Sequence, residues 1–173
     1  FLIFCFTAPY FATTDNMTRM LGQVAMNTVL AVGMTFVILV GGIDLSVGSV
    51  LALASVVGAI ILVQQPLPGI LSFGLDPVVS IPLAIAACLG VGALCGFFNG
   101  YVSERWRVPS FIVTLGMMSM ARGAAQVASN NSTINGLAKP FVDFGNWIVG
   151  GLVPVYFLIA IATVLVAWFV LRF

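Results

Sequence analysis

One carboxylate, Asp44, lies in a short glycine-rich interruption between two apolar runs, each of them long enough to cross a bilayer. On insertion scales an aspartate at the centre of a membrane helix costs about 2.5–3.5 kcal/mol, so Asp44 must lie at an interface, in a hydrated cavity or against a polar partner. A carboxylate in this setting is a candidate for function. Its surroundings read Gly41-Gly42-Ile43-Asp44-Leu45-Ser46-Val47-Gly48-Ser49.

The same stretch also has a structural interpretation. Gly41 and Gly42 release the backbone from helical geometry without a side-chain cost. Asp44 is a good N-cap for a helix that begins directly after it. We therefore predict a capped turn between two helices, with a gating role for the carboxylate as the alternative. The residues of this structural motif are Gly41, Gly42, Asp44, Ser46 and Gly48.

Polar side chains inside apolar segments are the next candidates, as residues of a translocation path. Gln23, Asn27 and Thr35 are spaced by four and eight residues, which places them close to one helix face. Such a stripe either forms interhelical hydrogen bonds, worth about 0.6–2 kcal/mol each, or lines a hydrated pathway for a polar solute. Arg122 lies about 18 Å along its predicted helix. It either serves the same path or extends its long stem to the outer interface.

Other chemistry has little support in the sequence. There is no histidine, which removes the commonest metal ligand and the commonest general base near neutral pH. The three cysteines, Cys5, Cys88 and Cys95, lie in apolar runs and are interpreted as small core residues. No Gly-x-x-x-x-Gly-Lys-Ser/Thr motif is present. We therefore predict no catalytic residue, no metal site and no bound cofactor on this chain.

Composition predicts the class of protein that must position these residues. The chain is 61% apolar and 6% charged, whereas a soluble domain has about 25% charged residues. It is therefore predicted to be an all-α, polytopic transmembrane helical bundle surrounded by lipid. The net charge is +1 and no basic run occurs, so nucleic acid is not an expected partner.

Six segments are apolar enough to be membrane spans, which need about 20 residues each. Residues 1–10 are too few and are interpreted as the second half of a truncated span. The other five spans are predicted at about residues 22–40, 45–63, 78–100, 109–127 and 147–171. Because the sequence begins without a methionine and stops at Phe173, residues 1–173 are expected to be a single transmembrane domain truncated at both ends.

Three glycines in the fourth of these segments are spaced four residues apart and share one helix face. They are expected to form a smooth surface for close helix packing, with a ligand role as the alternative. These residues are Gly92, Gly96 and Gly100.

The distribution of positive charge predicts sidedness, since Lys and Arg concentrate in short cytoplasmic loops. Arg105, Arg107 and Arg172 fall on one side, whereas Arg19 and Lys139 fall on the other. The side with the shorter connections, that of Arg105 and Arg107, is predicted to be cytoplasmic. The Gly41–Asp44 stretch then faces inward, and polar loops face outward at residues 11–21, 64–77 and 129–146.

Two sequence blocks resemble a known family. Residues 31–49, Ala-Val-Gly-Met-Thr-Phe-Val-Ile-Leu-Val-Gly-Gly-Ile-Asp-Leu-Ser-Val-Gly-Ser, closely resemble the signature of the ribose/xylose-type permease subunits of bacterial ABC sugar importers. Residues 108–123, Val-Pro-Ser-Phe-Ile-Val-Thr-Leu-Gly-Met-Met-Ser-Met-Ala-Arg-Gly, look like a later motif of the same family. Their order and separation are those expected of that family.

The resemblance implies a multi-pass permease of the bacterial inner membrane, with about ten spans in a complete family member. It implies pairing with a second permease subunit, either identical or a sibling. Two cytoplasmic ATP-binding subunits would bind the ATP, and a periplasmic sugar-binding protein would deliver a pentose, a hexose or a related polyol. The loop that docks on the ATP-binding subunit would lie beyond Phe173.

Alternatives to this family remain open from the residues alone. An ion-coupled secondary transporter is the nearest, because such proteins often use glycine-interrupted helices at binding sites near the membrane midplane. A receptor or a membrane-embedded enzyme is a more distant alternative, since no second intramembrane acid accompanies Asp44.

Overall fold

The computed structural model describes residues 2–65, 68–151 and 153–172. The chain divides into two compact units. We call Val37–Val142 the middle unit, and Phe1–Phe36 together with Asp143–Phe173 the terminal unit. The expected truncation points, Phe1 and Phe173, lie outside the described residues. The expectation of a single domain stays a prediction.

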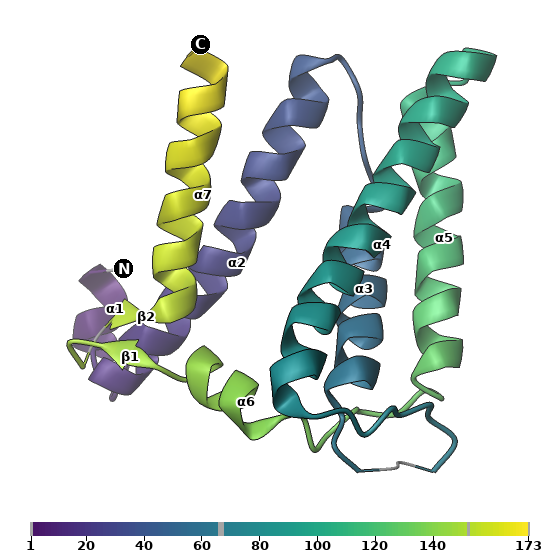
Figure 1. Cartoon of the computed structure of the whole chain (residues 1–173). Helices are drawn as coiled ribbons and strands as arrows, with labels where there is room; N and C mark the ends of the chain where they lie inside the picture. The colour runs from purple at the N-terminus through teal and green to yellow at the C-terminus, as the bar shows by residue number, and fades with distance from the viewer. Residues whose placement is uncertain (1, 66–67, 152, 173) are drawn as a thin grey trace. The chain divides into compact units, whose positions relative to one another are not determined.

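Helices account for most of the described chain, as predicted (Figure 1). They are α1 (Leu2–Thr7), α2 (Thr14–Leu39), α3 (Val47–Leu62), α4 (Pro77–Trp106), α5 (Ser110–Ala128), α6 (Lys139–Gly145) and α7 (Val155–Arg172). Among the described residues, four helices are long and apolar enough to cross a membrane, namely α2, α4, α5 and α7. The class of helical membrane bundle is therefore confirmed.

Two of the six predicted spans are shorter than expected. The helix α1 has six described residues, and α3 has 16. At 1.5 Å per residue, α3 is about 24 Å long, which is less than the hydrocarbon thickness of about 30 Å. The helix is mostly apolar, with Ser49 and Ser55 as its polar side chains, and it is too short to cross the hydrocarbon core by itself.

Several helix ends differ from the prediction because polar residues continue a helix. Residues 14–21, predicted to be a surface loop or an interfacial helix, form the first turns of α2, with Asp15 in the first turn, where the helix dipole favours an acid. The helix α4 continues past its predicted end to Trp106. It stops at Arg107, which adopts the left-handed conformation with φ of 55°.

The last predicted span also begins later than expected. Ile148–Val149 (β1) and Val153–Pro154 (β2) pair as a short antiparallel hairpin, so α7 starts at Val155 and not near residue 147. The turn between the strands contains Gly150 at φ 64° and Gly151 at φ 74°, a backbone conformation that glycine adopts without strain. The short α6 also lies within the predicted loop of residues 129–146.

Helix packing in the middle unit is closest between α3 and α4 (Figure 1). A Cβ atom built on Gly58 of α3 would lie 2.6 Å from the Cys88 sulfur of α4. The Cys88 thiol donates a hydrogen bond to the carbonyl of Ala54 at 3.2 Å. A cluster of buried residues continues this interface, formed by Ile61, Leu62, Ala84 and Ala138.

The glycine face predicted for close packing has no close packing partner among the described residues. A Cβ atom built on Gly92, Gly96 or Gly100 would meet no other atom within 4 Å. The close approach predicted for these residues is found instead at Gly58. A packing role for the three glycines stays a prediction.

The two ends of the middle unit differ in structure. Figure 1 shows the α2–α3 connection and the α4–α5 turn at one end, and the α3–α4 and α5–α6 connections at the other. At the second end, the Gln64 N–H donates to the Gly136 carbonyl at 3.1 Å, and the Ala138 N–H donates to the Leu62 carbonyl at 2.9 Å. Asp44 therefore lies at the same end as Arg107, as predicted, whereas the side of the membrane that this end faces stays a prediction.

In the terminal unit, α2 and α7 approach each other closely at Gly22. A Cβ atom built on Gly22 would lie 2.9 Å from the ring of Tyr156. The two residues that flank the hairpin before α7 are also bonded, because the Val155 N–H donates to the Trp147 carbonyl at 3.1 Å.

The packing at Gly58 yields a stability prediction. Gly58→Ala should lower the free energy of unfolding by about 1–3 kcal/mol, the usual cost of overpacking, because the new methyl group displaces the Cys88 thiol from Ala54. Gly48→Ala on the same helix is the matched control, since its Cβ would meet nothing within 4 Å. Thermal unfolding in detergent measures both. Adding Cys88→Ala should restore part of the stability that Gly58→Ala loses, and a further loss would contradict the proposed clash.

Candidate functional site

The chain between α2 and α3, residues 40–46, is non-helical, and we call it the break segment. It begins with a Schellman motif that closes α2. The Gly42 N–H donates to the Val37 carbonyl and the Gly41 N–H to the Ile38 carbonyl, both at 2.9 Å. Gly41 has φ of 77°, the left-handed conformation that this motif requires and that glycine adopts at no steric cost. The predicted role of the two glycines in ending the helix is confirmed.

Side chains of α5 bind the backbone of the break segment. The Ile43 N–H donates to Ser110 Oγ at 3.0 Å, and the Leu45 N–H donates to Thr114 Oγ1 at 3.2 Å. The Thr114 hydroxyl lies within hydrogen-bond distance of two carbonyls, those of Ile43 at 3.3 Å and Phe111 at 3.2 Å. Ser110 and Thr114 are one helical turn apart, so a single face of α5 replaces the helical bonds that the break segment lacks.

Asp44 does not cap α3 in the predicted way. The helix begins at Val47, and the N-cap position belongs to Ser46. Asp44 Oδ1 accepts hydrogen bonds from the Ser46 N–H at 2.7 Å and from the Ser46 hydroxyl at 2.6 Å. This arrangement is an Asx turn, in which an aspartate side chain accepts a hydrogen bond from the backbone N–H two residues later. The prediction of Asp44 as the N-cap is therefore wrong by two residues, and its carboxylate instead orients the residue that begins the helix.

Asn99 of α4 completes this group of hydrogen bonds. Its amide Nδ2 donates to Ser46 Oγ at 3.1 Å, so a chain of hydrogen bonds runs from Asn99 through Ser46 to Asp44. Ser46 is fully buried, and Asn99 is 7% exposed. Within the described part of the chain, Asn99 Oδ1 is buried and has no hydrogen-bond partner.

Asn99 is not among the residues predicted from the sequence. It lies between Gly96 and Gly100, within the stripe that was interpreted as a packing surface. The available signal was its polarity, because an amide in an apolar membrane helix needs a polar partner.

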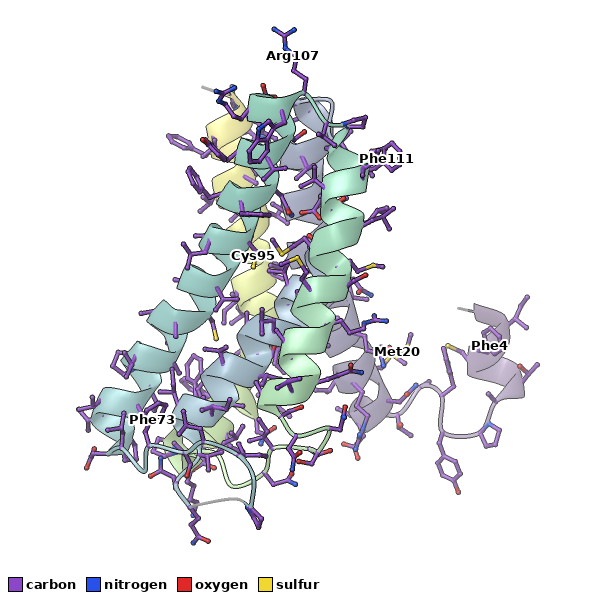
Figure 2. The ribbon with its side chains drawn as sticks, turned by 90° about the vertical axis from the view of Figure 1, so that its right-hand side faces the viewer. Phe4, Met20, Phe73, Cys95, Arg107 and Phe111 are labelled. Carbon is purple, nitrogen blue, oxygen red and sulfur yellow. The ribbon has the colours of Figure 1, made fainter. Side chains whose placement is uncertain are left out.

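An open hollow of about 590 Å³ lies beside the break segment, between it and the adjoining ends of α4 and α5. This volume is within the range of about 300–1,000 Å³ that is typical of small-molecule sites. Figure 2 shows Arg107 at this end of the middle unit, with its side chain extended away from the helices. The polar residues that line the hollow are Asp44, Asn99, Ser103, Glu104, Arg107, Ser110 and Thr114.

The predicted path residues have exposed side chains. Gln23, Asn27 and Thr35 lie on the part of α2 that belongs to the terminal unit, and the Thr35 hydroxyl donates to the Ala31 carbonyl at 2.8 Å. Arg122 lies on α5 in the middle unit and does not line the hollow. A role of these four residues in translocation stays a prediction.

A permease family accounts for most of the chain. The family model described as a branched-chain amino acid transport system permease component matches residues 16–173. The chain therefore belongs to this family of transport permeases, and it is a multi-pass membrane protein. No solved structure gives a significant match.

Curated relatives of the chain are sugar permeases. It is 39% identical to the ribose import permease protein of Escherichia coli K12 over 140 residues, which cover 81% of this chain and 40% of that protein. It is 37% identical to the ribose import permease protein of Haemophilus influenzae over 95% of this chain and 48% of the relative. The fructose import permease protein of Rhizobium meliloti is 34% identical over 94% of this chain and 44% of its own length. The chain thus spans less than half the length of each of these three relatives.

The bonds between α5 and the break segment yield a second prediction. Thr114→Val keeps the shape of the side chain but leaves the Leu45 N–H without its partner, so the free energy of unfolding should fall by about 1–3 kcal/mol. The control is Ser119→Ala, whose hydroxyl bonds only within α5, to the Leu115 carbonyl. Unfolding in detergent and the rate of proteolysis within residues 40–46 measure the effect. Equal values for the two variants would show that Thr114 does not hold the break segment.

Proposed function

We propose that the chain is part of the permease subunit of an ATP-driven ABC importer, and that it forms part of the path by which a monosaccharide crosses the bacterial inner membrane. The structural observation that supports this most is the break segment beside its open hollow, which polar and apolar residues line together. Irregular backbone at membrane depth is tolerated where it is buried in protein or lines a water-filled cavity. The polar groups of the break segment could therefore bind a polar solute, which the lipid hydrocarbon excludes.

The substrate class follows from the relatives. Their names assign them to ribose, fructose and D-allose, which are a pentose and two hexoses. A neutral sugar needs hydrogen-bonding groups along its path but no tight site, since strong binding would slow its release. In addition to the hollow, the exposed polar residues Gln23, Asn27, Thr35 and Arg122 are the candidates for such a path.

The partners belong to the same proposal. A second permease subunit, either a copy of this chain or a sibling, completes the path. Two cytoplasmic ATP-binding subunits bind and hydrolyse ATP, and a periplasmic sugar-binding protein delivers the solute. Closure of the ATP-binding subunits switches the permease pair between its outward-facing and inward-facing states. The absence of a phosphate-binding Gly-x-x-x-x-Gly-Lys-Ser/Thr motif from this sequence supports placing ATP on the partner subunits.

An ion-coupled secondary transporter is the second candidate. A glycine-rich break next to a carboxylate, as at Gly42 and Asp44, is also used by transporters that couple solute movement to an ion. Membership of a permease component family favours the ATP-driven importer.

Uptake by the complete permease, reconstituted in proteoliposomes with its ATP-binding subunits and binding protein, separates the two candidates. We expect uptake of labelled ribose, fructose or allose that requires hydrolysable ATP and persists when ionophores collapse the ion gradients. Uptake that continues without ATP and stops with an ionophore would support the secondary transporter instead.

The polar stripe on α2 is tested in the same assay. The double variant Gln23→Leu/Asn27→Leu should lower the uptake rate at least about tenfold, which corresponds to about 1.4 kcal/mol, because two hydrogen-bonding groups leave the path. Its matched control is Thr28→Val, also on α2, whose hydroxyl bonds only to the Val24 carbonyl of its own helix. Co-purification of the ATP-binding subunits measures assembly. Unchanged uptake in the double variant would exclude the stripe from the path.

A further inference from the structure

We propose that the hollow beside the break segment is a binding subsite for a neutral, polyhydroxylated solute. In this subsite Asp44 is the charged hydrogen-bond acceptor, and Ser46 and Asn99 are the residues that position it. The inference rests on the proposed transport function and adds to it a location and a recognition chemistry. It also gives the carboxylate at residue 44 a role that differs from capping a helix.

The geometry of Asp44 leaves one of its oxygens available. Both hydrogen bonds from Ser46 go to Oδ1. No described residue donates a hydrogen bond to Oδ2, and the half-buried side chain lines the hollow. A hydroxyl that donates to a carboxylate forms a bond about twice as strong as one between neutral groups. Asp44 is therefore suited to accept a hydroxyl of a solute in the hollow.

Asn99 and Ser46 fix the direction of this carboxylate. Ser46 has one hydroxyl hydrogen, and the Asn99 amide approaches the same oxygen as a donor. The Ser46 hydrogen must therefore point to Asp44 Oδ1, where the distance is 2.6 Å. This arrangement leaves the buried Asn99 Oδ1 without a partner, which is a cost in free energy. Because an apolar residue would avoid that cost, we assign to Asn99 the placement of Ser46 and not the stability of the fold.

The lining of the hollow matches a neutral polyol better than an ion. Its charged residues are Asp44, Glu104 and Arg107, with a net charge of −1, which disfavours anions. Ca²⁺ takes six to eight oxygen ligands and Mg²⁺ an octahedral set, and no group of three or more His, Cys, Asp or Glu side chains in the described chain could hold a metal. Apolar side chains such as Val40 and Pro109 lie beside these donors and acceptors, a combination that suits the C–H faces and O–H rim of a sugar.

Glycines give the hollow its space. Gly96 and Gly100 line it, and a Cβ atom built on either would meet no other atom within 4 Å. A larger side chain at either position would therefore start in open space and extend into the hollow. Gly92 has the same freedom on the same helix but does not line the hollow. It is the matched control.

The experiment measures uptake kinetics per assembled complex in the reconstituted importer. Gly96→Leu and Gly100→Leu should each reduce kcat/KM at least about tenfold, whereas Gly92→Leu should match the wild type. If Gly92→Leu reduces assembly and uptake as strongly as the other two, the three glycines form a helix-packing surface and the subsite proposal is overturned. Wild-type kinetics in Gly96→Leu and Gly100→Leu would overturn it as well.

The role of Asp44 is tested with Asp44→Asn, which keeps an acceptor for Ser46 but removes the charge. We expect KM to rise at least about fivefold with a smaller change in kcat. Sugar analogues that each lack one hydroxyl add a second readout. One analogue should bind poorly to the wild type, and this penalty should shrink in Asp44→Asn. A penalty that is the same in both proteins for every analogue would show that Asp44 accepts no solute hydroxyl.

The positioning role of Asn99 has its own readout. Asn99→Leu should reproduce the rise in KM seen for Asp44→Asn, and combining the two substitutions should add little, because they act through one chain of hydrogen bonds. Additive effects would contradict the chain. Failure of the proposed function is distinct from all these results, since the wild type itself would then show no ATP-dependent uptake.

Discussion

Backbone hydrogen bonding is the constraint on which the rest of this structure depends. In hydrocarbon no water is present to bind an exposed N–H or C=O group, and each unsatisfied group costs several kcal/mol. The chain leaves helical geometry for residues 40–46, and the backbone groups freed there need partners wherever water is excluded. It does so only where Ser110 and Thr114 bind the freed backbone and where Asp44 and Ser46 bind each other.

The middle unit is held together by different contacts along the length of α3. At its start the contacts are polar, from Ser46 to Asn99 on α4. Farther along α3, Gly58 packs closely against Cys88 of α4. At the end of the helix, the apolar residues Leu62 and Ala138 are buried together. A helix that is polar at one end and apolar at the other has a defined register on its neighbours, because sliding it by one residue would place Ser46 and Gly58 opposite unsuitable partners.

Local sequence patterns predicted what depends on local physics. The apolar composition, the helix stop at Gly41 and Gly42, and the start of α5 directly after Pro109 follow from hydropathy and turn chemistry. The position of Asp44 relative to the start of α3 does not follow from local patterns. The backbone on either side of it is bound by α5 side chains 67 to 71 residues away in the sequence. Asn99 was missed for a related reason, because its partner is distant and its neighbours suggested packing.

The beginning of α3 at Val47 has an electrostatic consequence for the break segment. The N-terminus of a helix has a partial positive charge of about half a unit, and Asp44 lies three residues before this one. The carboxylate and the helix end therefore offset much of each other's field. A hollow bordered by such a pair has a weaker field at a distance than an isolated carboxylate would give, yet it still offers a directional acceptor at contact range.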